Sequence, residues 1–125
     1  MAALADMNAV LAFLLDDRPV ERRMVAEWVE DHGPLLVTEA VFIETCWVVG
    51  SGLAVSRAEL VEHIRRVIAS SSFDTWDDGL VATTLELMER HPRLAPVDCM
   101  LAARVRRGDS VVTFDRRLAR VLEGP

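Results

Sequence analysis

The sequence predicts an α/β fold with a short parallel sheet, and three observations point to it. Short apolar strands alternate with longer amphipathic helices, which is the order that builds a parallel sheet covered by helices. Hydrophobic residues make up 51% and charged residues 27% of the chain, a balance typical of globular rather than disordered proteins. No repeat, low-complexity tract or linker divides the 125 residues, so we expect residues 1–125 to form a single domain.

The first elements are predicted from their turn and cap residues. A short strand ends at Ala5, and Asp6 then opens a helix through Leu15 by an Asx-type turn. Pro19 suits the first turn of a second helix, which residues 32–34 (His-Gly-Pro) end. Three apolar residues at helical spacing line one face of that helix: Val20, Met24 and Trp28.

The middle of the chain is predicted to hold a buried strand and two further helices. Residues 35–37 (Leu-Leu-Val) form the strand, and Thr38 caps the helix that follows. That helix, residues 39–50, is apolar almost all round, so we expect it to be buried. Residues 56–59 (Ser-Arg-Ala-Glu) form a capping box, and the helix behind it carries an apolar stripe: Leu60, Ile64, Val67 and Ile68.

The last part of the chain alternates in the same way, and cap or breaker residues bound its elements. We predict a strand over residues 73–76, a helix from the Asp77-Asp78 cap to about Arg90, a helix from Pro96 to Gly108, a strand over residues 110–113 (Ser-Val-Val-Thr), and a short helix from the Asp115 cap to about Val121.

Four carboxylates lie at the edges of these apolar segments or within them. Asp6 and Asp115 follow strand ends, where ligand sites of parallel α/β folds lie. Asp98 lies at a helix start, and each of these three aspartates also makes an ordinary helix N-cap. Glu44 lies mid-helix in the apolar run of residues 40–49, and a buried carboxylate needs a positive partner. That partner is either an arginine or a metal ion.

A shared cation is the functional explanation of these four residues. Carboxylates that converge repel one another, so some become protonated unless a positive ion lies between them. Mg²⁺ or Mn²⁺, bound by oxygen ligands, removes that repulsion and can activate water for attack on a phosphodiester. The structural alternative is three separate helix caps and one buried Glu–Arg pair, and the two explanations stay open at this point.

Every one of the Lys+Arg 14 is an arginine, and many lie late in the chain. Arginine binds phosphate through two parallel hydrogen bonds and stacks on bases. A GC-rich coding bias explains the missing lysine, however, and a solvated helix face explains the clustering. The net charge of -6 argues mildly against bulk nucleic-acid binding. The candidates for RNA phosphate contact are Arg104, Arg107, Arg116 and Arg117.

The expected location is the cytoplasm. Cys46 and Cys99 lie in apolar helical contexts, so we expect both to be reduced and buried. The N-terminus lacks the positive start of a cleaved signal peptide. No apolar run is long and uncharged enough to span a bilayer, so we expect no membrane partner.

The order and spacing of these residues resemble those of a PIN domain. The resemblance rests on Asp6-Met7-Asn8, on Thr38-Glu39 with Glu44, on residues 97–103 around Asp98, and on residues 111–118 around Asp115. It covers nearly the whole chain. More narrowly, the sequence resembles the small single-domain ribonuclease toxins of bacterial VapBC toxin–antitoxin systems.

The resemblance implies a three-layer sandwich in which about seven helices flank a short central parallel sheet. It also implies an endoribonuclease that depends on Mg²⁺ or Mn²⁺ and cleaves RNA phosphodiesters by metal-activated water. A toxin of this kind is expected to form a homodimer and to bind a cognate antitoxin. By position, the catalytic residues and metal ligands are Asp6, Glu44, Asp98 and Asp115, with Asn8 and Thr113 orienting carboxylates and water.

Other functions remain open at this stage. One is a PIN nuclease of RNA processing that is not a toxin. Another is a PIN-like module that binds RNA or protein without cutting, although clustered negative charge facing phosphates argues against it. A phosphatase on a similar sheet would need an Asp-x-Asp motif after the first strand, whereas position 8 is Asn.

Overall fold

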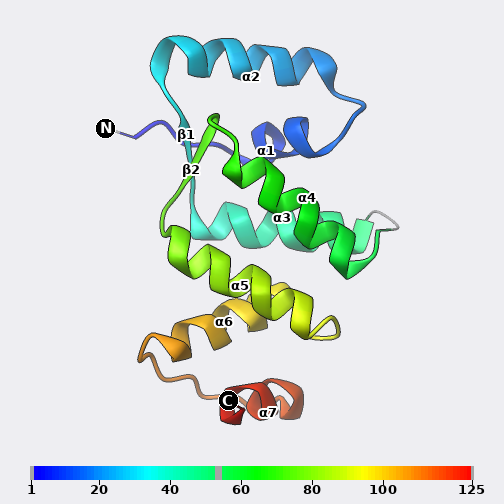
Figure 1. Ribbon diagram of the computed structural model, residues 1–125, viewed down its shortest axis with the longest axis vertical. Helices are drawn as coiled ribbons and strands as arrows, with labels where there is room; N and C mark the ends of the chain where they lie inside the picture. The colour runs from blue at the N-terminus through cyan, green and yellow to red at the C-terminus, as the bar shows by residue number, and fades with distance from the viewer. Residues whose placement is uncertain (1, 53–54, 125) are drawn as a thin grey trace. The chain divides into compact units, whose positions relative to one another are not determined.

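The computed structural model describes residues 2–52 and 55–124 and divides into two compact units, Met1–Trp76 and Asp77–Pro125. Among the described residues, seven helices and a short parallel sheet occur, which confirms the predicted α/β class (Figure 1). The elements are α1 (Met7–Leu14), α2 (Pro19–His32), β1 (Leu35–Val37), α3 (Glu39–Gly52), α4 (Arg57–Ala69), β2 (Phe73–Thr75), α5 (Asp78–Arg90), α6 (Pro96–Arg106) and α7 (Arg116–Glu123).

The sheet of the first unit is built from β1 and β2, which run parallel in the register Leu35 to Phe73. The connection between them contains α3 and α4, as a parallel crossover requires. The predicted first strand contributes only an isolated parallel bridge between Leu4 and Leu36. The Ala5 N–H donates to the Leu36 carbonyl at 2.9 Å, and the Leu36 N–H donates to the Ala3 carbonyl at 2.7 Å. An alanine-rich segment with low β propensity explains this shortened strand.

The predicted strand at residues 110–113 is wrong. These residues are irregular between α6 and α7, and Val112 in this segment is 92% exposed. The described residues of the second unit contain no strand. A β-prone segment forms a strand only where a neighbouring strand accepts and donates its backbone hydrogen bonds. Composition identified the β-prone segment, but composition says nothing about the partner.

Helix starts agree with the predictions wherever a polar side chain marks them. In the capping box, the Glu59 N–H donates to Ser56 Oγ at 3.1 Å. The Thr38 hydroxyl accepts from the Val41 N–H at 3.4 Å, at the start of α3. Caps of this kind each stabilise a helix by about 1 kcal/mol. The starts of α3 and α4 are therefore defined by local hydrogen bonds.

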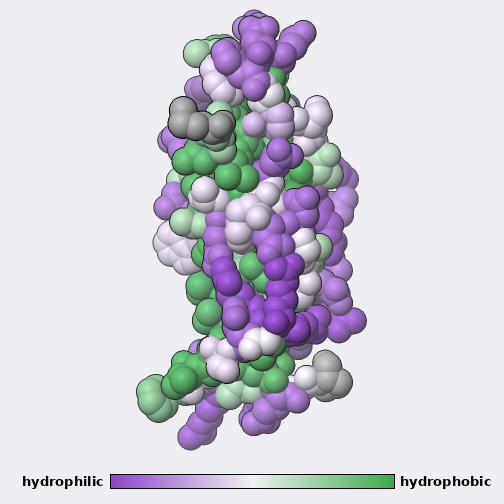
Figure 2. Space-filling view, turned by 90° about the vertical axis from the view of Figure 1, so that its left-hand side faces the viewer, coloured by the Kyte–Doolittle hydropathy of each residue, from purple (hydrophilic) through white to green (hydrophobic). Residues whose placement is uncertain are grey.

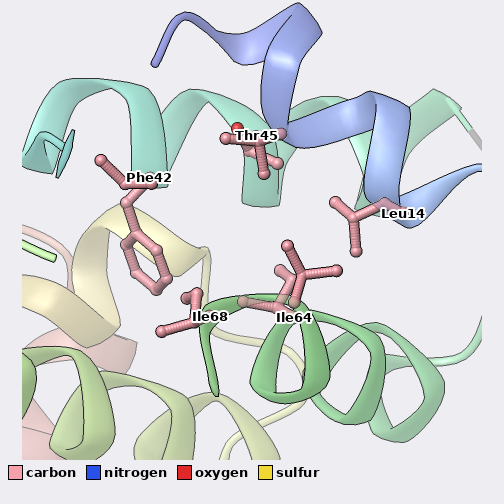
Figure 3. A pocket seen from close by; sticks show the side chains of 8 residues that line it. Leu14, Phe42, Thr45, Ile64 and Ile68 are labelled. Atoms are coloured by element: carbon pink, nitrogen blue, oxygen red, sulfur yellow. The ribbon is translucent and has the colours of Figure 1, made fainter. Parts of the chain in front are cut away.

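The core of the first unit lies between α1, α3 and α4. Figure 3 shows Leu14 from α1, Phe42 and Thr45 from α3, and Ile64 and Ile68 from α4 converging on one small cavity. The cavity measures only about 10 Å³, room for one water at most. The Thr45 hydroxyl donates to the Val41 carbonyl at 2.7 Å, so this buried polar group is satisfied within its helix. The cavity is packing space rather than a ligand site.

Helix α3 buries one side instead of its whole circumference. Phe42, Thr45, Cys46 and Val49 are buried, whereas Glu44 is exposed and Trp47 is 63% exposed. The prediction of an all-round buried helix is therefore wrong. An apolar run in the sequence gives the mean hydropathy of a helix, but not which of its faces meets the core.

Helix α2 has no buried residue. It is joined to α1 by Arg22, which donates to the Ala12, Phe13 and Leu15 carbonyls at 2.9, 3.2 and 3.1 Å. These are carbonyls at the C-terminal end of α1, where helix carbonyls lack partners of their own. The apolar face of α2 is exposed. Elsewhere too, hydrophobic residues reach the surface among hydrophilic ones (Figure 2). The exposed fractions are 62% for Val20, 63% for Met24 and 40% for Trp28.

The second unit is a packed set of helices. Helix α5 buries Leu80, Thr84 and Met88, and α6 buries Cys99 and Met100. The Thr84 hydroxyl donates to the Leu80 carbonyl at 2.8 Å and lies 3.4 Å from the Met100 sulfur. The side chain of Leu118 from α7 is also buried.

Both cysteines are buried, as predicted, and no disulfide joins them. None of the described helices combines the length and the apolar character that crossing a membrane requires.

The two large aromatic side chains of α3 provide a test of its orientation. Phe42 is 2% exposed and Trp47 is 63% exposed. We expect Phe42→Ala to lower the free energy of unfolding by about 3–5 kcal/mol, because it empties a core position. Trp47→Ala should change it by about 0.5 kcal/mol or less. Urea denaturation of both variants measures the difference, and equal losses would contradict the burial assigned to α3.

Candidate functional site

Asp6 lies directly after the bridge formed by Leu4 and begins α1. Its Oδ1 atom accepts a hydrogen bond from the Ala9 N–H at 2.9 Å, so this carboxylate is a helix N-cap. The side chain is exposed, and no described residue is hydrogen bonded to its second oxygen. One oxygen therefore positions the carboxylate, and the other is available to a ligand.

Asp6 and Asn8 line a groove of about 530 Å³ between α1 and α2. The opposite wall includes Met24 and Glu21, and Arg18 lies at the same groove. Arg18 Nη1 donates to Asn8 Oδ1 at 3.5 Å. Arg18 and Glu21 were not predicted as site residues, because only the packing of α2 on α1 brings them beside Asp6.

Glu44 lies in the middle of α3 with its side chain exposed to solvent. The expectation that its burial demands a positive partner is therefore wrong. No ion pair to Glu44 occurs among the residues that the structure describes. The physical reason is rotation about the helix axis, which directs Glu44 away from the core side occupied by Phe42 and Thr45. An exposed carboxylate costs little to keep charged and remains available to a ligand.

Asp98 lies in the first turn of α6, half-buried, but does not cap the helix. The N-cap is Ala95, with Pro96 at the first helical position, so the cap explanation of Asp98 is wrong. Burial raises the pKa of the Asp98 carboxyl, and the negative charge of Asp115 raises it further. Asp115 therefore lies close enough to Asp98, within the second unit, to disfavour the ionised form of Asp98.

Asp115 caps α7 through Oδ1, which accepts from the Arg117 N–H at 2.8 Å and the Leu118 N–H at 3.1 Å. The Asp115 N–H in turn donates to Thr113 Oγ1 at 3.0 Å. Thr113 thus fixes the backbone from which the carboxylate projects. As with Asp6, one carboxylate oxygen holds the side chain in place while the other has no described partner.

The four candidate acids are divided between the units, Asp6 and Glu44 in the first and Asp98 and Asp115 in the second. Within the described part of either unit, no three His, Cys, Asp or Glu side chains gather into a metal-binding group. The donor set itself suits Mg²⁺ or Mn²⁺, because it consists of carboxylate oxygens, the ligands that these cations prefer. The raised pKa of Asp98 fits as well, since a cation would relieve the repulsion from Asp115.

The arginines proposed for phosphate contact differ in their surroundings. Arg107 forms a two-pronged ion pair with Asp77, through Nη1 to Oδ2 and through Nη2 to Oδ1 at 2.7 Å. Arg104 lies 3.5 Å from an oxygen of Asp109. Arg116 and Arg117 lie in the first turn of α7, and Arg117 Nη1 donates to the Arg93 carbonyl at 3.3 Å. Arg104 and Arg107 must leave acidic partners to bind a phosphate.

Comparison with known proteins identifies the family from the sequence. Residues 3–123 match the PIN domain. The chain belongs to the PIN domain family. PIN domains are nucleases in general, so the fold is that of a hydrolase acting on nucleic acid, of a kind that generally uses divalent metals. No curated protein and no solved structure matches the chain. The match to the PIN domain spans Asp6, Glu44, Asp98 and Asp115.

The Asp77–Arg107 pair makes the stability of the PIN domain depend on pH. The Arg107 hydrogen bond, with a smaller contribution from the Leu80 N–H, lowers the pKa of Asp77 from 3.8 to about 2. A folded-state pKa below the unfolded value gives stabilisation that is fully present above pH 3.8 and lost as the pH falls through about 2. We expect Asp77→Asn, which can still cap α5, to lower stability at pH 6 and to match the original protein near pH 2.

Thermal unfolding between pH 6 and pH 2 measures this effect. Asp17→Asn, at an exposed turn position between α1 and α2, is the matched control for the change of charge. A stability difference for Asp77→Asn that stays constant across this pH range would contradict the contribution of the ion pair.

Proposed function

We propose that this PIN domain is an endoribonuclease that depends on Mg²⁺ or Mn²⁺ and hydrolyses RNA phosphodiesters. The observation that carries the proposal is the Asp98–Asp115 pair in a chain of a nuclease family. The charge of Asp115 raises the pKa of Asp98, and neither carboxylate forms an ion pair with a described residue. Retaining such a pair without a cationic side chain is reasonable for a site that takes its positive charge from a metal ion.

Asp6 and Glu44 are the proposed ligands from the first unit. The available oxygen of Asp6 and the exposed carboxylate of Glu44 support this assignment. Asn8 and Thr113 are the proposed positioning residues. Thr113 holds the backbone of Asp115, and Asn8 lines the groove beside Asp6. Metal-binding carboxylates generally depend on such neighbours for their orientation.

In the proposed reaction, some side chains contribute charge and others orient the carboxylates. A bound divalent ion supplies positive charge for the scissile phosphate and an activated water for the attack. The helix caps of Asp6 and Asp115 keep those carboxylates in fixed orientations, which lowers the cost of arranging the site. Arg116 and Arg117 are the phosphate contacts that we favour, because Arg104 and Arg107 already lie beside acids.

We further propose that the protein is a cytoplasmic toxin of the VapC type, active as a homodimer and neutralised by an antitoxin. The exposed row of Val20, Met24 and Trp28 along α2 supports a protein partner for this face. An antitoxin helix with apolar residues at matching spacing suits such a row. The product of the neighbouring reading frame, expressed together with the chain, tests this role directly by relief of growth arrest.

Two conservative substitutions test the nuclease mechanism. We expect Asp98→Asn and Glu44→Gln each to reduce RNA cleavage by about 100-fold or more, because each removes a charged metal ligand. Glu30→Gln on the exposed surface of α2 is the matched control and should cleave normally. The assay follows cleavage of a labelled RNA with Mg²⁺ or Mn²⁺ and after chelation by EDTA.

The same variants separate loss of mechanism from loss of fold. Asp98→Asn removes the repulsion between Asp98 and Asp115, so the metal-free variant should unfold at the same or a higher temperature than the original protein. Full cleavage activity in either Asp98→Asn or Glu44→Gln would overturn the proposed mechanism. Cleavage that persists in EDTA would overturn the metal dependence.

A further inference from the structure

A cluster of arginines lies in the second unit, beside the candidate acid Asp115. It surrounds a surface pocket of about 370 Å³ in the second unit, within the range of roughly 300–1,000 Å³ usual for small-ligand sites. The pocket is formed by the end of α5, the turn that follows it and α7. Its lining residues are Arg90, His91, Pro92, Arg93, Leu94, Arg117 and Val121.

The lining combines positive charge with apolar surface. Three guanidinium groups come from Arg90, Arg93 and Arg117, and the described residues that line the pocket include no acid. Pro92 and Val121 provide apolar surface beside them. Guanidinium groups bind phosphate oxygens in pairs, and apolar side chains suit a sugar or the face of a base.

Two contacts bear on how ready this pocket is for an anion. Arg117 Nη1 donates to the Arg93 carbonyl at 3.3 Å, which holds the Arg117 side chain at the pocket. Arg90 lies 3.4 Å from Glu86, but both side chains are about half exposed or more, so this pair is weak and easily exchanged. The guanidinium of Arg93 has no partner among the described residues. An anion in the pocket would therefore displace little.

The position of the pocket relates it to the proposed reaction. Arg117 donates its backbone N–H to Asp115 Oδ1 at 2.8 Å, while its side chain reaches the pocket. One residue thus links a candidate catalytic acid to the arginine cluster. We propose that the pocket binds one nucleotide of the RNA strand next to the scissile bond, with its phosphate on Arg90, Arg93 and Arg117. This inference rests on the proposed nuclease function and names a substrate-binding pocket for it.

The test measures binding separately from cleavage. A fluorescent single-stranded RNA oligonucleotide is titrated with the inactive Asp98→Asn protein at several salt concentrations. Adding Arg93→Gln or Arg90→Gln should weaken binding about 5- to 10-fold and reduce the slope of log affinity against log salt by about 0.7, the value for one lost contact to a single strand. In the active protein, Arg93→Gln should raise KM and leave kcat nearly unchanged, because the pocket lies outside the chemistry.

Arg106→Gln is the matched control, because it removes the same charge from an exposed position of the same unit outside the pocket. Equal weakening by Arg106→Gln and Arg93→Gln would overturn the pocket, since general electrostatic attraction would explain both. If the protein cleaves RNA but the pocket variants bind like Arg106→Gln, the pocket is not an RNA-binding site, although the nuclease function is supported. If no RNA is cleaved but binding depends on Arg93 and Arg90, the pocket binds RNA and the proposed nuclease function is wrong.

Discussion

Two of the four candidate acids of this PIN domain depend on one interaction, the hydrogen bond from a helix N-terminus to a carboxylate oxygen. Asp6 and Asp115 each begin a helix and each accept backbone N–H groups through Oδ1. The helix N-terminus carries partial positive charge, so it stabilises a carboxylate that has no cationic neighbour. The same bond directs the side chain, because its oxygen cannot leave the cap without exposing an unpaired N–H group. At Asp6 and Asp115, the hydrogen bond that starts the helix therefore also positions the carboxylate.

Asp98 lacks such a capping hydrogen bond. It lies inside the first turn of α6 rather than at its cap, and burial together with the charge of Asp115 raises its pKa. Asp77, in the same unit, has both a cap and an arginine, and its pKa falls to about 2. The ionised form of Asp77 is stabilised by the folded structure, whereas the ionised form of Asp98 is destabilised by it. An acid of the second kind is the more informative one about function.

The features predicted correctly from the sequence are those that depend on neighbouring residues. The caps at Asp6, Ser56, Asp77 and Asp115 fixed the helix starts, because a cap and its N–H partner lie within three residues of each other. Three predictions failed because they required a distant partner or a helix rotation. The segment at 110–113 lacks a paired strand, α3 buries only one of its sides, and Glu44 faces solvent. The Asp77–Arg107 pair spans thirty residues and left no signal in the local sequence.

A chain with a net charge of -6 repels the phosphates of a nucleic acid, so binding requires a local surface of positive charge. The arginines divide into those beside acids, such as Arg107 with Asp77 and Arg104 with Asp109, and those that gather around Arg93. Around the pocket, the Arg93 guanidinium has no partner among the described residues and the Arg90–Glu86 pair is weak, so both arginines can bind a phosphate. The candidate acids repel the same phosphate until a cation neutralises them. In the proposed mechanism, metal binding therefore favours RNA binding, because the cation removes the repulsion between the acids and the phosphate, and by linkage RNA binding favours metal binding to the same extent.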